Sequence, residues 1–158
     1  MNQKKELNSL IELESQIERR IKEFNTKRGK NQWKNRFFSL AQIILSGFTT
    51  LLVAINANLS YFCITVITLV VSSLASISGQ LLSKFMYQER MAMNIATVCA
   101  LYELRHKITM DKKKQEDDHS LTITLQEVDL YQQQYQNILN TANGQWQKYI
   151  QDTKAIEK

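Results

Sequence analysis

Phe37 to Leu82 reads FFSLAQIILSGFTTLLVAI (37–55), NANLS (56–60) and YFCITVITLVVSSLASISGQLL (61–82), and no Asp, Glu, Lys or Arg occurs between Arg36 and Lys84. A single helix through this stretch would be roughly 70 Å long at ~1.5 Å per residue, more than twice the ~30 Å hydrocarbon core of a bilayer. Two spans of about 20 residues each match that thickness. The stretch therefore predicts two transmembrane helices, at 37–56 and 61–83, folded back on each other as a hairpin.

The segment 56–60 is where we expect the chain to turn. Its Asn and Ser side chains can bond to carbonyls left over at a helix end, and Asn tolerates the left-handed conformation that ends helices. The competing interpretation is a soluble helical bundle whose central hairpin is its core, and the amides of Gln42, Asn56 and Gln80 keep it open. A buried soluble hairpin, however, rarely extends so far without a charged outward face.

Basic residues collect at the membrane ends of both predicted spans. This basic belt consists of Lys27, Arg28, Lys30, Lys34, Arg36 and Lys84. Residues 1–36 carry ten Lys or Arg and five Asp or Glu, whereas residues 84–158 carry ten of each. The positive-inside rule then predicts both termini in the cytoplasm and the Asn-rich turn on the other side of the membrane. Anionic lipid attracts such a belt at roughly 1 kcal/mol per residue near the surface.

The pattern argues against several other classes of protein. Nucleic-acid binding is not expected, because the basic residues gather at a span boundary instead of on a solvent-facing helix with interleaved aromatics. The first 30 residues contain no apolar h-region, so we expect the first span to act as the insertion signal. Cys63 and Cys99 are too far apart for us to expect a disulfide or a metal pair.

Enzymatic activity is likewise not expected, and we predict no cofactor. The sequence has no Gly-rich phosphate loop, HExxH, CxxC or G-x-S-x-G motif. Its two histidines, His106 and His119, have charged or polar neighbours, which predicts solvated surface positions for both.

The polar flanks also predict helices, and the whole chain reads as one domain. An N-terminal helix lies in 1–36, a stalk helix in 84–110 continues the second span without a break, a charged linker occupies 111–121, and a final helix covers 122–158. Thr124 and Glu127 have the spacing of a capping box, in which each side chain bonds to the other's backbone amide.

Each flanking helix carries an apolar stripe at helical spacing. The stripes are Leu7, Leu10, Ile17, Ile21 and Phe24, interrupted by Glu14; Met86, Met91, Ile95, Val98, Leu101, Tyr102 and Leu104; and Leu125, Val128, Tyr135, Leu139, Ala142, Trp146 and Tyr149. Such stripes need partner helices. We therefore predict a cytoplasmic helical bundle, which either stays monomeric or builds a homo-oligomer.

Small and polar residues recur at helical spacing inside the spans. The candidate packing or pore-lining positions are Gln42, Ser46, Thr49, Asn56, Thr65, Thr68, Ser72, Ser76 and Gly79. They either pack the helices together, since small residues let backbones approach closely, or line an aqueous path in an oligomer. Because neither stripe contains a charged residue, a pore made from them would be weakly selective.

The layout resembles the SLATT family, the SMODS- and SLOG-associating two-transmembrane effector domains of bacterial conflict systems. The matching features are RGKNQWKNR (28–36) leading into the first span, a tight turn, a second span, YQER (87–90) and LYEL (101–104) in the stalk, and a helix ending around Trp146. The resemblance implies an antiphage effector that oligomerises in the inner membrane and breaks its permeability barrier, arresting or killing the infected cell by abortive infection. It also implies a stand-alone form, whose nucleotide-signal sensor or synthase is a separate chain.

Two alternative functions remain open. One is a non-conducting scaffold, in which the hairpin is an anchor and the flanking helices recruit a partner protein. The other is a phage holin, although holins are usually shorter and end in a small basic tail, whereas residues 84–158 are charge-balanced.

Overall fold

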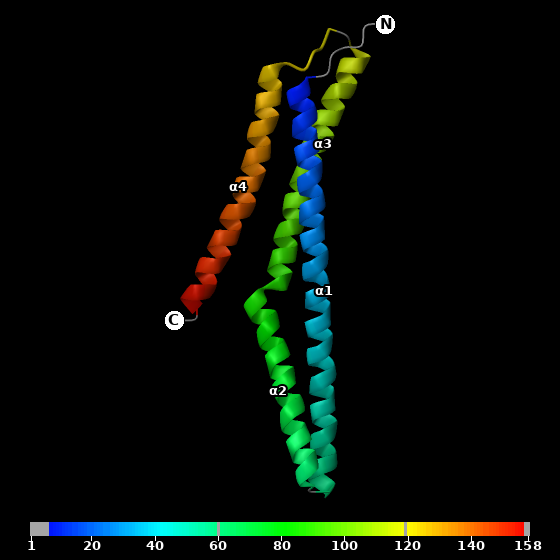
Figure 1. Ribbon diagram of the computed structural model, residues 1–158, viewed down its shortest axis with the longest axis vertical. Helices are drawn as coiled ribbons and strands as arrows, with labels where there is room; N and C mark the ends of the chain where they lie inside the picture. The colour runs from blue at the N-terminus through cyan, green and yellow to red at the C-terminus, as the bar shows by residue number, and fades with distance from the viewer. Residues whose placement is uncertain (1–6, 60, 119, 157–158) are drawn as a thin grey trace. The chain divides into compact units, whose positions relative to one another are not determined.

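Four α-helices account for nearly all of the residues that the computed structural model describes, which are 7–59, 61–118 and 120–156; no side chain is described at 58, 59, 146 and 149–156. In chain order the helices are α1 (Asn8–Leu59), α2 (Phe62–Phe85), α3 (Tyr87–Asp117) and α4 (Leu125–Ile156) (Figure 1). The chain contains no proline and only four glycines, so little in the sequence interrupts a helix. The prediction of an all-α fold with two long apolar helices is confirmed.

The chain divides into two units, which we describe separately. The core unit comprises Met1–Arg28 and Ala92–Lys158, and the apolar unit comprises Gly29–Met91. α1 contributes to both units, because it continues without interruption through the predicted N-terminal helix, the basic belt and the first predicted span. The core unit thus draws on three helices, while the apolar unit holds the rest of α1, all of α2 and the first turn of α3.

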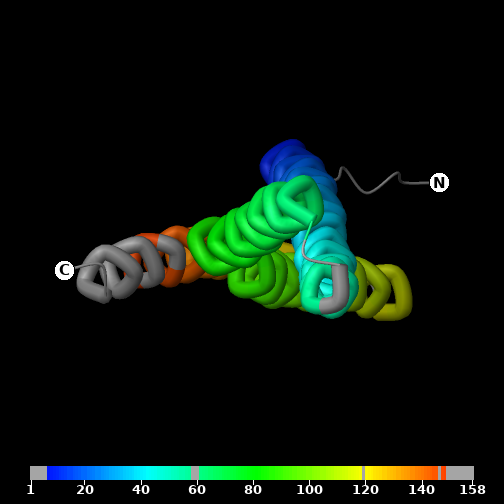
Figure 2. Tube along the Cα trace, turned by 90° about the horizontal axis from the view of Figure 1, so that it is seen from below, coloured from blue at the N-terminus to red at the C-terminus, as the bar shows by residue number. Residues whose placement is uncertain are grey.

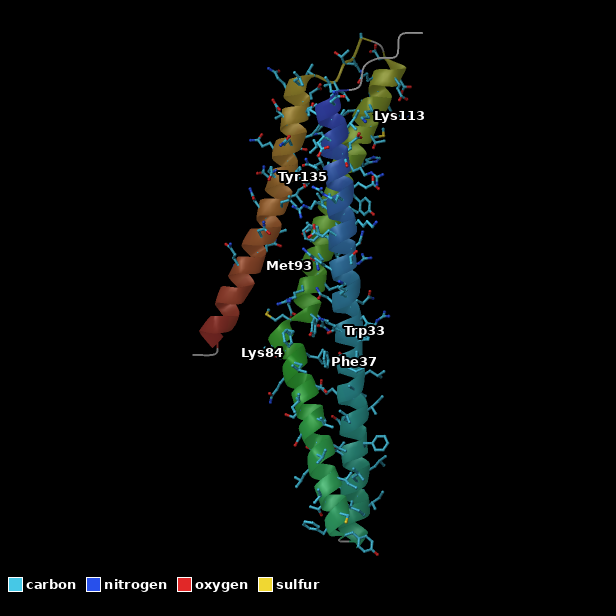
Figure 3. The ribbon with its side chains drawn as sticks, viewed as in Figure 1. Trp33, Phe37, Lys84, Met93, Lys113 and Tyr135 are labelled. Atoms are coloured by element: carbon cyan, nitrogen blue, oxygen red, sulfur yellow. The ribbon has the colours of Figure 1, made fainter. Side chains whose placement is uncertain are left out.

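The core unit is built on one buried apolar cluster drawn from α1, α3 and α4. Its members are Leu10, Leu13, Ile17 and Ile21 of α1, Leu101, Leu104 and Ile108 of α3, and Val128, Tyr131 and Tyr135 of α4. Figure 3 shows Tyr135 on the side of α4 that faces α1. Most of the predicted stripe residues of α1 are therefore core, and Leu7 and Phe24 pack at its edge.

Sequence periodicity placed some residues of the core unit wrongly. Ile95 and Tyr102, predicted in the α3 stripe, are exposed, and so is Leu125 of α4. Leu13, Ile108 and Tyr131 lie in the cluster without having been assigned to a stripe. The side chains of Trp146 and Tyr149 lie outside the described residues, as does His119.

Glu14, the polar residue in the α1 stripe, has a specific partner. Its carboxylate accepts a hydrogen bond from Lys112 Nζ of α3 at 2.6 Å. Both side chains are less than one-third exposed, which reduces the solvent screening of this contact. The polar residue thus adds an interhelical ion pair beside the apolar core.

The prediction of a linker at 111–121 is wrong for most of that range, because α3 continues to Asp117. The prediction took the lack of apolar residues as a sign of a loop. Lys and Glu favour helix, however, and charges three residues apart are neighbours on its surface. Lys113 pairs with Glu116 at 2.8 Å and Lys114 pairs with Asp111 at 2.9 Å. The connection to α4 therefore begins after Asp117 and is shorter than predicted.

The prediction that the second span continues into the stalk helix without a break is also wrong. Met86 separates α2 from α3 and has left-handed backbone angles, φ 46° and ψ 47°. The ribbon in Figure 1 breaks at this point. For a residue other than glycine, this conformation costs about 1–2 kcal/mol. Aromatic contacts on both sides of Met86, described below, accompany the break.

The start of α4 has the predicted capping box. Thr124 N–H donates to Glu127 Oε2 at 2.7 Å, and Glu127 N–H donates to Thr124 Oγ1 at 3.3 Å. Both backbone amides would otherwise lack a helical acceptor. This prediction is confirmed, and it fixes the point at which the chain re-enters helix.

In the apolar unit, the end of α1 and the start of α2 are neighbours in both views (Figures 1 and 2). Asn56 Nδ2 of α1 donates to Thr65 Oγ1 of α2 at 2.9 Å. Farther along the same two helices, Gln42 lies against Gly79. The two helices therefore pack side by side in opposite directions. The predicted turn at 56–60 is partly wrong, because α1 continues to Leu59; Ser60 lies outside the described residues.

Candidate functional site

The surface of the apolar unit is covered by large apolar side chains. Those that are exposed on α1 and α2 are Phe37, Leu40, Ile43, Ile44, Phe48, Leu51, Val53, Ile55, Phe62, Val66, Ile67, Leu69, Val70, Leu74, Ile77 and Phe85. In the most apolar 18-residue stretch of α1 no residue is buried, and in that of the second candidate span only 6% are buried. These two helical stretches are long and apolar enough to cross a membrane.

Exposure on this scale is unfavourable for a helix pair in water. Hiding apolar area from water gains roughly 25 cal/mol per Å², and contiguous exposed patches above a few hundred Å² mark membrane or partner surfaces. If the apolar unit were the core of a soluble bundle, these side chains would be buried inside it. The described residues provide no such cover for them.

Five aromatic side chains form a cluster at one end of the exposed surface, which we call the aromatic cluster. Trp33 stacks on Phe37 with ring centroids 5.6 Å apart, and Phe37 meets Phe38 edge to face at 5.4 Å. Phe38 stacks on Tyr87 at 6.2 Å, and Phe85 stacks on Tyr87 at 5.7 Å. The contacts therefore lead from α1 across to both sides of the α2–α3 junction.

Basic residues lie at the same end of the apolar unit as the aromatic cluster. Figure 3 shows Trp33 and Phe37 on α1 and Lys84 on α2 at a similar level. Lys30, Lys34 and Arg36 alternate with these aromatic residues along α1. Aromatic and basic side chains together are typical of the boundary between hydrocarbon and water.

The other two predicted belt residues, Lys27 and Arg28, belong to the core unit. Lys27 Nζ donates to Glu23 at 2.6 Å and lies over the Phe24 ring. Arg20 donates to the same carboxyl at 2.7 Å. Hydrogen bonds from Lys27 and Arg20 lower the pKa of Glu23. Lys27 is therefore partly engaged within its own helix.

Two pairs of the predicted polar residues meet between α1 and α2. One is the Asn56–Thr65 hydrogen bond described above. The other is Gln42 with Gly79, where a Cβ at residue 79 would lie 2.8 Å from Gln42 Nε2. Glycine at this position thus makes room for the amide of the neighbouring helix. These four residues act in helix packing within one chain.

Several hydroxyl groups bond to their own helix. Thr49 Oγ1 donates to the Leu45 carbonyl at 2.9 Å, and Thr68 Oγ1 donates to the Ile64 carbonyl at 2.8 Å. Such bonds let a hydroxyl lie in apolar surroundings without an unpaired donor. The three remaining candidates, Ser46, Ser72 and Ser76, have exposed side chains.

The core unit holds a polar contact that sequence reasoning missed. Tyr131, which is 3% exposed, donates its hydroxyl proton to Asp111 Oδ2 at 2.6 Å. This hydrogen bond, with a second one from Lys114, lowers the pKa of Asp111. Burial and the same hydrogen bond raise the pKa of Tyr131. The sequence signal was the position of Tyr131, three residues after Val128 and four before Tyr135, which places it on the same helix face.

The aromatic cluster was also missed as a unit, although Trp33 and Phe37 have the four-residue spacing of helical neighbours. Among the described residues, no group of three or more His, Cys, Asp or Glu side chains could hold a metal ion. The candidate site is therefore a surface that is apolar along two helices and aromatic and basic at one end.

No protein-family model, curated protein or solved structure matches the chain.

Proposed function

We propose that this chain is a membrane effector of a bacterial antiphage system, of the kind that the SLATT resemblance implies. Residues 37–56 and 61–83 cross the inner membrane as a hairpin, and the core unit is a cytoplasmic bundle. The observation that carries the proposal is the exposed apolar surface of α1 and α2, without a buried residue in the most apolar stretch of α1. Lipid is the solvent in which that surface is stable.

The dimensions of the helices support this placement. α2 has 24 residues, which is about 36 Å at ~1.5 Å per residue and exceeds a ~30 Å hydrocarbon core. Lys30, Lys34 and Lys84 mark the same end of the hairpin, and the turn between the spans has no basic residue. The positive-inside rule assigns that basic end to the cytoplasm.

In the proposed activity, several copies associate and make the membrane leaky. Ser46, Ser72 and Ser76 supply the exposed hydroxyl groups for contact between copies or for an aqueous path. Neither span contains Asp, Glu, Lys or Arg, because none occurs in the sequence between Arg36 and Lys84. This absence of charge favours a weakly selective leak. A separate sensor or synthase protein supplies the trigger.

A non-conducting scaffold is the second candidate, and one observation favours it. Asn56 contacts Thr65 and Gln42 contacts Gly79 within one chain, and Thr49 and Thr68 bond to their own helices. Six of the nine candidate residues thus have a role that requires no pore. In this case the hairpin is an anchor and the core unit binds a partner protein.

Single-cysteine labelling tests the topology. The chain has two cysteines, Cys63 and Cys99, both exposed. In one variant Cys63→Ser leaves Cys99 as the only thiol; in the other, Cys63→Ser and Cys99→Ser are combined with Ala57→Cys beside the turn. A membrane-impermeant maleimide applied to intact spheroplasts should label residue 57 and leave Cys99 unlabelled until the membrane is disrupted. Equal labelling of both before disruption would overturn the membrane hairpin.

Leakage separates the effector from the scaffold. Cells expressing the chain, with and without phage infection, are followed with a membrane-potential dye. The Ser46→Leu, Ser72→Leu, Ser76→Leu variant should lose depolarisation, whereas Val70→Leu, at an exposed apolar position of α2, should keep it. Persistent polarisation of cells with the unaltered chain, in both conditions, would contradict the effector and leave the scaffold as the better proposal.

A further inference from the structure

The α2–α3 junction combines an unusual backbone with ordinary sequence. Among the described residues, Met86 is the single non-glycine residue with positive φ. A left-handed conformation is normally occupied by glycine, and sometimes by Asn or Asp, because a Cβ crowds the following carbonyl. Something other than the local preference of residue 86 must hold this conformation.

The sequence around the junction favours an uninterrupted helix. Lys84, Phe85, Met86, Tyr87 and Gln88 include no Gly, Pro, Asn or Asp, the residue types that end helices. Met and Lys are among the better helix formers. The helical hydrogen-bond pattern resumes at once, since Arg90 N–H donates to the Met86 carbonyl at 3.0 Å. The local sequence and the observed structure therefore favour different states of the same segment.

The aromatic cluster accounts for the observed state. Phe85 and Tyr87 stack with ring centroids 5.7 Å apart and ring planes 22° apart. In an unbroken helix, residues two positions apart point in nearly opposite directions, so these rings could not meet. The stack thus requires the break at Met86. Tyr87 is 6% exposed and also stacks on Phe38 of α1, with ring planes 6° apart.

We propose that Met86 is a two-state hinge. In the broken state Tyr87 stacks on both Phe38 and Phe85. In the continuous state residues 62–117 form one helix, Tyr87 turns away, and both contacts are lost. Because the favourable stack and the unfavourable left-handed backbone exist only together, their contributions to the free-energy difference between the two states oppose each other. A signal that binds one state better can then shift the population. The inference concerns the backbone and holds whether or not the chain forms a pore.

The native cysteines provide the measurement. Cys63 lies on α2 and Cys99 on α3, on opposite sides of the hinge, and the chain has no other thiol. Spin labels on both residues of the full chain in lipid nanodiscs give their distance distribution by pulsed electron paramagnetic resonance. One continuous helix would separate the two Cα atoms by about 54 Å at ~1.5 Å per residue. A bend at residue 86 shortens this distance, because a straight helix is the most extended arrangement of two directly joined helical segments.

Two substitutions of residue 86 should act in opposite directions. Met86→Gly removes the Cβ that makes the left-handed backbone unfavourable, so the ratio of the short to the long population should rise roughly tenfold. Met86→Ile introduces a β-branched side chain, which tolerates positive φ least, and should raise the long population. Met91→Gly and Met91→Ile, in the first turns of α3, are the matched controls and should leave the ratio near that of the unaltered chain.

The aromatic contact is tested in the same assay. Phe38→Leu removes the stack on Tyr87 and should raise the long population, whereas Phe37→Leu, at a half-exposed neighbouring ring, should change it little. The hinge is overturned if the Met86 variants shift the distribution in the same direction, or if neither differs from its Met91 control. A Met86→Ile chain that fails to fold leaves the Met86→Gly and Phe38→Leu results to decide.

Discussion

The core unit and the apolar unit use apolar side chains in opposite ways. Ile17, Leu101 and Ile108 of the core unit are 0% exposed, whereas Ile43 and Phe48 of the apolar unit are 69% and 57% exposed. Both units are made of helices, and α1 belongs to both. The difference therefore lies in the distribution of side chains around the helices.

Their polar contacts differ in the same sense. The core unit joins α1 to α3 through the ion pairs Glu14–Lys112 and Glu18–Arg105, at 2.6 and 3.3 Å. The apolar unit joins α1 to α2 through a neutral hydrogen bond, Asn56–Thr65. Ions are stable where water reaches them, and neutral bonds are less costly in an apolar phase. The polar contacts thus differ between the units in the way that the proposed membrane placement of the apolar unit requires.

The largest expected effect comes from removing side-chain volume in the core unit. Leu101→Ala deletes fully buried methyl groups and should lower the free energy of unfolding by about 2–5 kcal/mol, because the cavity closes only in part. Leu40→Ala, at a 59% exposed position of α1, should cost less than about 1 kcal/mol. Denaturant titration of the detergent-solubilised protein, followed by circular dichroism, gives both values. Equal losses would remove the contrast between the two units.

A charge on the exposed surface tests which solvent covers the apolar unit. Phe48 lies near the middle of the predicted first span. Replacing it with arginine should raise the free energy of membrane insertion by about 2.5–3.5 kcal/mol. We expect a large fall in the share of protein that resists extraction from membranes by alkaline carbonate. Tyr102→Arg, at a 46% exposed position of α3 in the core unit, is the control and should leave extraction unchanged. An inserted fraction unaffected by Phe48→Arg would indicate water, not lipid, around α1.

The hydrogen bond between α4 and α3 should contribute a smaller, pH-dependent amount. Tyr131→Phe keeps the buried ring and removes the hydroxyl group, leaving the Asp111 carboxylate one donor short. Hydrogen bonds to charged groups contribute roughly 1.5–3 kcal/mol, and the loss should be near the lower end because Asp111 keeps Lys114. Tyr102→Phe is the matched change at an exposed tyrosine and should have almost no effect.

The sign of the pH dependence follows from Asp111. Its pKa in the folded chain lies below the ordinary value of 3.8, so its contribution to stability is fully present above that value. The contribution is lost as the pH falls through the lowered pKa. Thermal unfolding between pH 6 and about pH 2.5 should therefore show a shallower acid loss for Tyr131→Phe than for the unaltered chain. Parallel curves would mean that the Tyr131 bond does not set the pKa of Asp111.

The sequence predicted the features that depend on composition and period. The all-α fold, the two long apolar helices and most of the α1 core stripe follow from the charge-free stretch and from three- and four-residue spacings. Among the candidate polar residues, the sequence did not separate Gln42 and Gly79, which meet between helices, from Ser72 and Ser76, which are exposed. Both sets have the same spacing, and only the partner helix distinguishes them.

The misses have two physical causes. The break at Met86 accompanies a stack with Phe38 of another helix, and local propensity favours no break there. Sequence periodicity identifies one helix at a time, so it does not contain this contact. The continuation of α3 to Asp117 was missed for a local reason, because charged residues favour helix and pair along its surface, as Lys113 does with Glu116.

The capping box of α4 should produce the smallest effect. It tests whether the core unit can be destabilised locally without affecting the apolar unit. Thr124→Ala removes the acceptor for the Glu127 amide and should cost about 1 kcal/mol, while Thr122→Ala, two residues earlier in the same exposed connection, should cost almost nothing. Hydrogen exchange of the first α4 amides should quicken in Thr124→Ala, and the amides of α2 should keep their rates. A loss of protection in α2 as well would show that the two units unfold together.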